Sequence, residues 1–311
     1  MHSRPGGACP ETAIGAGKIA GNPIGELDSV VNRKGQNNMD VQSRTKVAAL
    51  AQRVRAHCLR MTHRGRSGHV GSMLSMAEIV SVLYTQVLRV DPAHPEWADR
   101  DRFVLSKGHG GGAVYAVLGE LGFFPMEWFE GYYRDAGKLM GHISHHVPGV
   151  EFSTGSLGHG LPVAVGMALA ARQAGRTHRV VCLLSDGDCN EGSTWEAILF
   201  AAQHRLDNLT VLVDYNQVQA LGHSEEVLDL SPFSRKLSDC RWATKEVDGH
   251  DVGAIDEALH TLPFEIGKPS WLICHTVKGK GVSWMENTVS CHYGSVTDEQ
   301  LAQALAEVGG N

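Results

Sequence analysis

The chain has 311 residues, of which 42% are hydrophobic and 20% are charged, and it carries a net charge of −6. This ordinary globular profile excludes a general attraction to nucleic acid; no segment approaches the roughly 20 apolar residues of a membrane span, and no apolar run near the N-terminus indicates a secretory signal. Seven scattered cysteines without a Cys-x-x-Cys pair favour reduced thiols in a cytoplasmic protein and argue against a zinc site.

The predicted elements begin after a segment without periodicity. Residues 1–40 are rich in Gly, Asn, Pro and Ala, which predicts a flexible N-terminal tail, and residues 41–311 are expected to form one domain. From Val41 the apolar side chains recur at helical spacing, and a second helix is expected over residues 75–88. The later predicted elements are, in order, a strand at 102–105, helices near 111–121, 127–134 and 162–174, a strand at 180–184, a helix at 194–205, strands at 209–213 and 242–247, a helix at 252–262, a strand at 270–276 and a helix at 299–307. This alternation predicts an α/β fold, a doubly wound parallel sheet flanked by helices.

Polar side chains follow two of the predicted strands. Asp186 and Gly187 come just after the strand at 180–184, and Asn216 comes just after the strand at 209–213. The carboxyl ends of parallel strands form the edge of an open sheet where ligands bind. A carboxylate and an amide oxygen suit Mg²⁺ or Ca²⁺, and Gly187 lets the backbone approach a phosphate closely. The simplest ligand that requires all three residues is a diphosphate with its bridging divalent cation.

With these two loops the chain resembles the thiamine diphosphate enzymes, and transketolases in particular. Their motif is Gly-Asp-Gly, followed by an Asn about one strand–helix–strand unit later; here Ser185 stands at the first glycine. The resemblance implies the diphosphate-binding (PP) fold over nearly the whole chain outside the tail. It also implies that the side chains of Asp186 and Asn216 and the carbonyl of Val218 bind Mg²⁺, with Ca²⁺ or Mn²⁺ as alternatives.

A glycine-rich turn, Gly155-Ser156-Leu157-Gly158-His159-Gly160, precedes the predicted helix at 162–174. Backbone N–H groups at such a helix start suit a phosphate, while tight packing between helices is the alternative explanation of the glycines. A similar transketolase segment lines the diphosphate. The resemblance therefore implies that the backbones of Gly155 and Leu157, together with Gly187 and Asn216, contact the cofactor.

Four of the 17 histidines lie in segments that match transketolase motifs. The resemblance implies that His69, His142 and His292 face the donor substrate and act in catalysis, and that His109 and His292 contact the cofactor phosphate. Ile143 replaces the proline that follows His142 in the family. An imidazole can donate to a developing oxyanion and shuttle protons, and its ordinary pKa is expected to serve without large tuning.

Other polar residues keep open interpretations. His145 and His146 could join His142 in a transition-metal cluster, or they could contact substrate, whereas His250 is expected to be structural. Asp188 could support the metal site from behind or simply form a turn.

The sequence also leaves the roles of Glu191 and of the segment from Lys278 to Gly281 open. Glu191 is expected at a subunit interface. The segment from Lys278 to Gly281 could lie on the phosphate side or form a solvated loop.

The resemblance covers only the diphosphate-binding first domain of a transketolase. No segment matches the pyrimidine-binding domain, which carries the glutamate that activates the cofactor, and in the family the cofactor lies between domains of different subunits. We therefore expect the N-terminal subunit of a two-chain transketolase, active only with a C-terminal pyrimidine-domain subunit, with α2β2 as the expected assembly. It would transfer a two-carbon ketol unit from a ketose phosphate to an aldose.

Three hypotheses remain: a transketolase of general sugar-phosphate metabolism, the same machinery recruited to a specialised biosynthetic or sugar-catabolic pathway, and a non-catalytic cofactor-binding subunit. The substrate-facing histidines weigh against the third, because cofactor binding alone does not require them. A 2-oxoacid dehydrogenase α subunit shares the metal motif but not the histidine segments.

Overall fold

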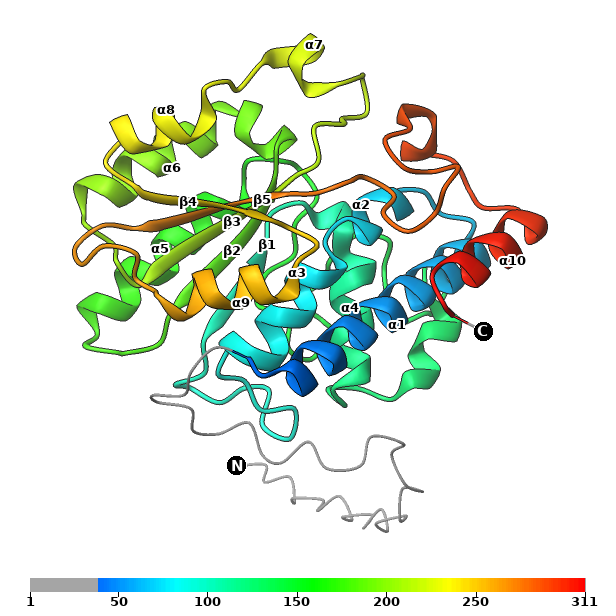
Figure 1. The fold of residues 1–311 in the computed structure, drawn as a ribbon. Coiled ribbons are helices and arrows are strands. Elements are labelled where there is room, and N and C mark those ends of the chain that lie inside the picture. Colours follow the sequence, from blue (N-terminus) through cyan, green and yellow to red (C-terminus); the bar gives the residue numbers. More distant parts are fainter. Residues whose placement is uncertain (1–38, 311) are drawn as a thin grey trace, which may run out of the picture.

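The computed structural model describes residues 39–310, so residues 1–38 of the tail predicted over 1–40 lie outside the described residues. A five-stranded parallel sheet with the order β1-β2-β3-β5-β4 forms the centre (Figure 1). Its strands are β1 (Arg102–Leu105), β2 (Val180–Ser185), β3 (Leu209–Tyr215), β4 (Ala243–Asp248) and β5 (Ser270–His275). The chain crosses the sheet from β1 to β3, passes over one position to β4 and returns to β5 between them.

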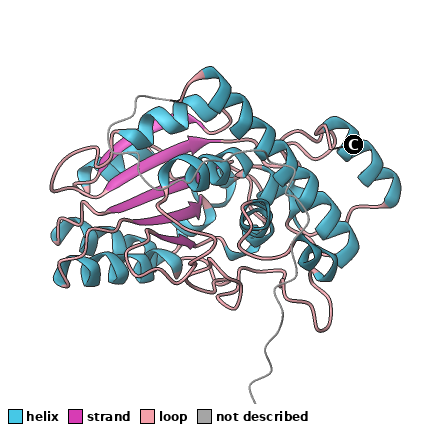
Figure 2. Cartoon of the chain, turned by 90° about the horizontal axis from the view of Figure 1, so that it is seen from below, coloured by secondary structure: helices cyan, strands magenta, loops and turns pink. Residues whose placement is uncertain are grey.

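Helices cover both faces of this sheet, as a doubly wound fold requires (Figure 2). They are α1 (Val41–Gly65), α2 (Val70–Leu74), α3 (Ala77–Val82), α4 (Gly111–Glu120), α5 (Gly160–Gln173), α6 (Gly192–Gln203), α7 (Ser224–Leu228), α8 (Phe233–Asp239), α9 (Val252–His260) and α10 (Asp298–Glu307). In Figure 1, α5, α6 and α8 lie on one face, and α1, α3, α4 and α9 lie on the other.

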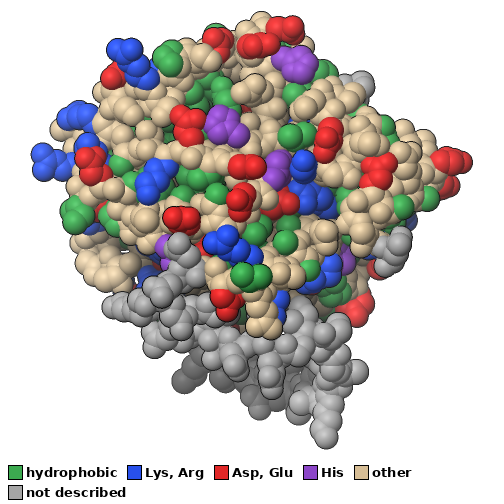
Figure 3. Space-filling model, in the orientation of Figure 1, with side chains coloured by type: hydrophobic (Ala, Val, Ile, Leu, Met, Phe, Trp, Pro, Cys, Tyr) green, Lys and Arg blue, Asp and Glu red, His purple; other side chains and the backbone are tan. Residues whose placement is uncertain are grey.

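Strands β1, β2, β3 and β5 are largely apolar because both faces of the sheet are covered there, and their successive side chains supply two separate cores. The edge strand β4 is mostly polar and only partly buried. Val181 and Leu183 of β2 belong to the core under α1 and α4, whereas Val180, Cys182 and Leu184 belong to the core under α5 and α6. On the surface shown in Figure 3, acidic and basic side chains are interspersed.

Two predicted helices differ in the structure. The single helix expected over residues 75–88 is instead α3 followed by a π-helical turn at Leu83–Val87, and the short helix α2 precedes it. The helix expected near 127–134 is a 3-10 helix at Met126–Gly131, and it ends there because the next residue, Tyr132, leaves helical geometry with a ψ of 129°. The sequence patterns also miss α7 and α8, which are only 5 and 7 residues long.

The described residues begin just before α1. The backbone N–H of Met39 donates to Asp256 Oδ2 at 2.9 Å, and the Met39 side chain is buried. Asp40 caps the helix by accepting a hydrogen bond from the Ser43 N–H at 2.7 Å. Over residues 39–310, no helix is both long enough and apolar enough to cross a membrane.

Candidate active site

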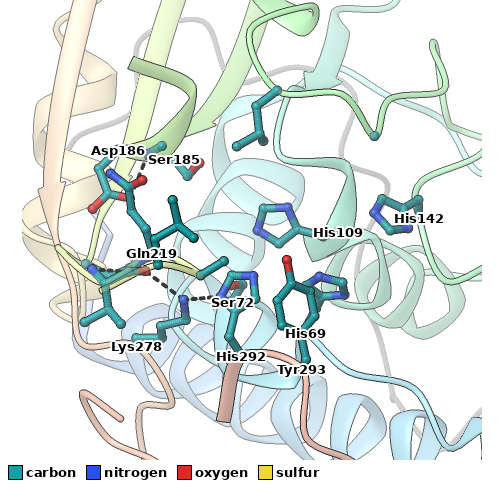
Figure 4. Close-up of a pocket in the computed structure, with 17 residues that line it drawn as sticks. His69, Ser72, His109, His142, Ser185, Asp186, Gln219, Lys278, His292 and Tyr293 are labelled. Atoms are coloured by element: carbon teal, nitrogen blue, oxygen red, sulfur yellow. Dashed lines mark hydrogen bonds between the residues drawn. The ribbon is translucent and has the colours of Figure 1, made fainter. Parts of the chain in front are cut away.

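A cavity of about 310 Å³ lies where the loops after the strands meet, and Figure 4 shows its lining. Every site residue predicted from the sequence lines this one cavity: His69, His109, His142, Gly155, Leu157, Asp186, Gly187, Asn216, Val218 and His292. These residues come from segments far apart along the chain, so the fold brings together the groups that the motifs single out. Their individual roles remain predictions.

The predicted metal ligands lie on one side of the cavity. The buried Asp186 carboxylate accepts hydrogen bonds from the Gly187 N–H at 3.0 Å and from Ser224 Oγ at 2.6 Å. Asn216 Nδ2 donates to Asp214 Oδ2 at 3.3 Å, which fixes the orientation of the amide group. Burial raises the pKa of Asp186, the hydrogen bond from Ser224 opposes that rise, and the neighbouring Asp214 charge adds to it. A buried carboxylate whose charge is disfavoured in this way is suited to a cation, so Asp186, the Asn216 oxygen and the Val218 carbonyl fit a divalent metal.

The alternative metal cluster finds no support. Over residues 39–310, no group of three or more His, Cys, Asp or Glu side chains is placed to hold a metal ion. The rings of His145 and His146 instead contact each other in a tilted arrangement with centroids 4.2 Å apart, and His145 Nδ1 lies 2.7 Å from Ser153 Oγ. Neither residue lines the cavity.

Asp188 lies behind the metal side and joins three loops. Its Oδ1 accepts hydrogen bonds from Ser106 Oγ at 2.6 Å and from the Gly158 N–H at 2.9 Å, and its Oδ2 accepts one from the Ser185 N–H at 2.9 Å. The loop after β1, the glycine-rich turn and the loop after β2 are therefore held by one buried carboxylate. This resolves the open interpretation of Asp188 in favour of a supporting role.

The glycine-rich turn serves close packing as well as the cavity. Gly158 has a φ of +77°, which favours glycine, and a Cβ on Gly160 would lie 2.5 Å from Ser106 Cα. Gly155 and Leu157 are the members of the turn that line the cavity. Close packing therefore accounts for Gly158 and Gly160, while the phosphate contact of Gly155 and Leu157 stays a prediction.

The histidine cluster, defined as His69, His109, His142 and His292, occupies the other side of the cavity. The ring centroid of His69 lies 5.2 Å from that of His109, 5.5 Å from that of His142 and 5.1 Å from that of His292. The backbone N–H of His69 also donates to the His292 carbonyl at 2.8 Å, which joins two distant parts of the chain.

These imidazoles are neutral near pH 7. Burial, followed by the charges of His142 and Lys278, lowers the pKa of His69 to about 4. Burial and the Lys278 charge lower the pKa of His292 to about 3, and burial also lowers the pKa of His109 and of His142. The expectation that these histidines need no large tuning is therefore wrong, because partial burial and nearby ammonium groups both oppose protonation.

Lys278 is a cavity residue whose place the sequence leaves open. Its side chain is buried, and its Nζ donates to the Val218 carbonyl and to His292 Nδ1, both at 2.7 Å. Because an ammonium group only donates, His292 Nδ1 must accept, and the proton of the neutral ring lies on Nε2. Burial, with the charge of Lys107, lowers the pKa of Lys278 to about 8. The segment Lys278-Gly279-Lys280-Gly281 is not simply a solvated loop, although nothing in its sequence indicates burial.

A buried ion pair lies directly behind the cavity. The side chains of Lys107 and Asp214 are both 0% exposed and form a salt bridge with each other. Lys107 Nζ also donates to the Ser72 carbonyl at 3.0 Å, and Asp214 accepts from Ser75 Oγ at 2.6 Å. The pair therefore connects the His109 loop, the segment that follows His69, and the end of β3 that presents Asn216.

Two other polar residues lie outside the cavity. His250 accepts a hydrogen bond from the Val277 N–H at Nε2, 2.9 Å, so its Nδ1 carries the proton and lies 3.1 Å from Glu78 Oε2. Both ring nitrogens are used within the fold, in agreement with the structural role expected for this residue. Glu191 is exposed on the described chain.

The geometry can be compared with known proteins. Residues 46–311 match the family model described as "Transketolase, thiamine diphosphate binding domain". The chain belongs to the transketolase family. A 6-deoxy-6-sulfo-D-fructose transketolase subunit from Clostridium sp. (strain MSTE9) is 39% identical over 78% of this chain and 88% of that protein. A subunit of an apulose-4-phosphate transketolase from Actinobacillus succinogenes is also 39% identical, over 78% of this chain and 87% of that protein.

Solved transketolases share the fold of this family member. The transketolase from Campylobacter jejuni has a TM-score of 0.80 and 29% identity, covering 87% of this chain and 43% of that chain. The transketolase from Leishmania mexicana has a TM-score of 0.79 and 31% identity, covering 85% of this chain and 41% of that chain. This chain thus spans about two fifths of the length of these solved transketolases.

Proposed function

We propose that this chain is the N-terminal, cofactor-binding subunit of a two-chain transketolase that uses thiamine diphosphate and Mg²⁺. It transfers a two-carbon ketol unit from a ketose phosphate to an aldose acceptor in the cytoplasm. The observation that carries the proposal is the convergence of all motif residues on one cavity, with the metal ligands on one side and the histidine cluster on the other.

The metal side fits the diphosphate of the cofactor. Asp186, the Asn216 side-chain oxygen and the Val218 carbonyl would hold Mg²⁺, which Ca²⁺ or Mn²⁺ could replace. The backbones of Gly155, Leu157 and Gly187, the imidazole of His109 and the ammonium of Lys278 line the same cavity and would hold the diphosphate oxygens. Thiamine diphosphate, when bound, supplies the nucleophilic-carbon chemistry needed to cleave a bond next to a carbonyl.

The histidine cluster serves the substrate. Since the pKa values of His69 and His292 are lowered to about 4 and about 3, both rings are neutral at pH 7 and each has one N–H to donate. His292 presents Nε2–H, because Lys278 occupies its Nδ1. Neutral donors aimed at the carbonyl oxygen stabilise the negative charge that develops there, and they can also accept from sugar hydroxyls. His69, His142 and His292 take this role in the proposal.

A partner chain supplies the rest of the site in this proposal. The relatives from Clostridium and Actinobacillus are named as transketolase subunits, and the chain covers 88% and 87% of their lengths but only 43% of the Campylobacter jejuni transketolase. These lengths support a C-terminal subunit with a pyrimidine-binding domain as the partner. Because most oligomers are closed and symmetric, we propose an α2β2 assembly.

The test compares the chain alone with the chain co-purified with its partner. We expect ketol transfer only from the assembly, and turnover by the isolated chain would contradict the shared site. In the assembly, Asp186→Ala should abolish Mg²⁺-dependent binding of thiamine diphosphate in isothermal titration calorimetry. Asp239→Ala removes an exposed carboxylate of α8 and serves as the matched control. Equal cofactor affinity in Asp186→Ala and wild type would refute the metal site.

Recruitment to a specialised sugar pathway is a second candidate. It is favoured by the names of the relatives at 39% identity, which specify 6-deoxy-6-sulfo-D-fructose and apulose-4-phosphate. Comparing kcat/KM of the assembly for these two donors with that for D-fructose 6-phosphate would decide between the candidates. A non-catalytic role is disfavoured because the substrate-facing histidines all line the cavity.

A further inference from the structure

Tyr293 stands at the substrate side of the cavity, and none of the motifs singles it out. It follows the 3-10 helix at Val289–His292 and lines the cavity. Its ring centroid lies 5.2 Å from that of His69 and 4.6 Å from that of His292. In Figure 4 the hydroxyl end of the ring points toward the histidine cluster. The side chain is nevertheless 68% exposed, so it does not serve to fill the core.

The backbone holds this tyrosine in place. The hydrogen bond from the His69 N–H to the His292 carbonyl, 2.8 Å, attaches the segment before Tyr293 to the loop that carries His69. On that loop, a Cβ added to Gly68 would lie 2.9 Å from Tyr293 Cα, so the two backbones are in direct contact. The exposed ring therefore projects from a fixed point beside the cluster.

The two rings beside Tyr293, those of His69 and His292, are uncharged imidazoles. The neighbouring imidazoles are neutral, since the pKa of His69 is lowered to about 4 by burial first and by nearby charges second. The cationic Lys278 donates to the Val218 carbonyl on the metal side and to His292 Nδ1, both at 2.7 Å. Over residues 39–310, the Tyr293 hydroxyl has no hydrogen-bond partner within the chain. A free phenol beside neutral imidazoles suits a hydroxylated carbon chain better than a phosphate group.

We propose that Tyr293 is a substrate-binding residue that contacts the hydroxylated part of the ketose donor. Its hydroxyl hydrogen-bonds a sugar hydroxyl, and its ring packs against the carbon chain of the sugar. The inference rests on the proposed function, because it assigns a substrate contact within that same site. It also separates two tasks: the tyrosine and histidine side recognises the uncharged part of the donor, and the anionic end is recognised elsewhere.

The test uses the complete assembly with D-fructose 6-phosphate as the donor. Tyr293→Phe removes only the hydroxyl, Tyr293→Ala removes the ring, and Tyr133→Phe makes the same chemical change at another exposed tyrosine outside the cavity lining. Loss of one neutral hydrogen bond predicts a rise in donor KM of about two- to tenfold in Tyr293→Phe, with kcat changed less than about twofold. Tyr293→Ala should show a larger rise in KM, while Tyr133→Phe should match wild type.

Separate measurements distinguish the two proposals. The affinity for thiamine diphosphate with Mg²⁺, measured by calorimetry, should be the same in all variants, whereas a general structural defect would lower it. Unchanged donor KM in both Tyr293 variants of an active assembly would overturn the substrate contact and leave the proposed function intact. If the wild-type assembly transfers no ketol unit from any tested donor, the proposed function fails. Direct calorimetric titration with D-fructose 6-phosphate then decides: weaker binding by Tyr293→Ala supports the contact, and equal or absent binding refutes it.

Discussion

Removing one member of the buried ion pair behind the cavity should destabilise the fold strongly. Lys107→Met keeps most of the side-chain volume but leaves the Asp214 carboxylate, which is 0% exposed, without its cation. Burial alone would raise the pKa of Asp214, and the Lys107 charge together with hydrogen bonds from Lys107, Ser75 and Thr276 holds it below its ordinary value. The substitution removes the Lys107 charge, which is the largest of the influences that lower the pKa of Asp214.

The expected loss of unfolding free energy depends on the hydrogen bonds that still reach the Asp214 carboxylate in Lys107→Met. Breaking a buried pair by removing one partner costs about 3–5 kcal/mol. Hydrogen bonds from Ser75 Oγ at 2.6 Å and Asn216 Nδ2 at 3.3 Å are retained in the variant, which favours the lower end, about 3 kcal/mol. In urea, a slope of about 3 kcal/mol per M converts this loss into a decrease of about 1 M in the unfolding midpoint.

Urea titration followed by tryptophan fluorescence measures the effect on the isolated chain. Lys268→Met is the matched control, because Lys268 forms an exposed ion pair with Glu265 and its loss should cost less than about 1 kcal/mol. The double variant Lys107→Met with Asp214→Asn should recover part of the loss, since the uncompensated charge is then absent. A loss below about 0.5 kcal/mol in Lys107→Met, similar to an ordinary surface substitution, would refute this account of the pair.

Two further predictions concern the histidines. His250→Ala removes hydrogen bonds to Val277 and Glu78, so it should lower the free energy of unfolding by about 2 kcal/mol while leaving the affinity for thiamine diphosphate unchanged; a selective loss of cofactor binding would show that the residue acts in the site. The pKa of His69 is lowered from 6.5 to about 4, so below pH 6.5 the unfolded chain binds a proton that the folded chain excludes. Stability of the cofactor-free chain should therefore be full above pH 6.5 and decline toward pH 4, less steeply in His69→Gln, as measured by urea midpoints; parallel pH profiles of variant and wild type would contradict the shift.

Strands β1, β2, β3 and β5 could be predicted from the sequence because each contains a short, nearly continuous apolar run, such as residues 180–184, bounded by polar loops, whereas β4 is mostly polar. Both faces of β2 are covered and all of its residues are buried, so an apolar residue is expected at every position of the strand. Short elements carry no such signal. The five residues of α7 and the end of the 3-10 helix at Gly131 depend on tertiary contacts, and local periodicity does not record those contacts.

The composition of the site could be predicted only where a motif names the residue. Asp186, Asn216 and the histidine cluster are found in this way, and all of them line the cavity. Lys278 and Tyr293 are not, because the first lies in a segment whose composition equally fits a solvated loop and the second lies in no motif. The lowered pKa values are also beyond the sequence, since they arise from burial and from the charge of Lys278.

The hydrogen bond between His69 and the His292 carbonyl has a consequence for biosynthesis. It connects a loop made early on the ribosome to a segment made near the end of translation. The side of the cavity that His292 and Tyr293 line is therefore missing from a nascent chain that lacks residues 289–293, even though the sheet and the loops that carry Asp186 and Asn216 are already complete. A message cut short within this region would yield a product that keeps the loops proposed to bind the metal but lacks one wall of the pocket proposed to bind the sugar.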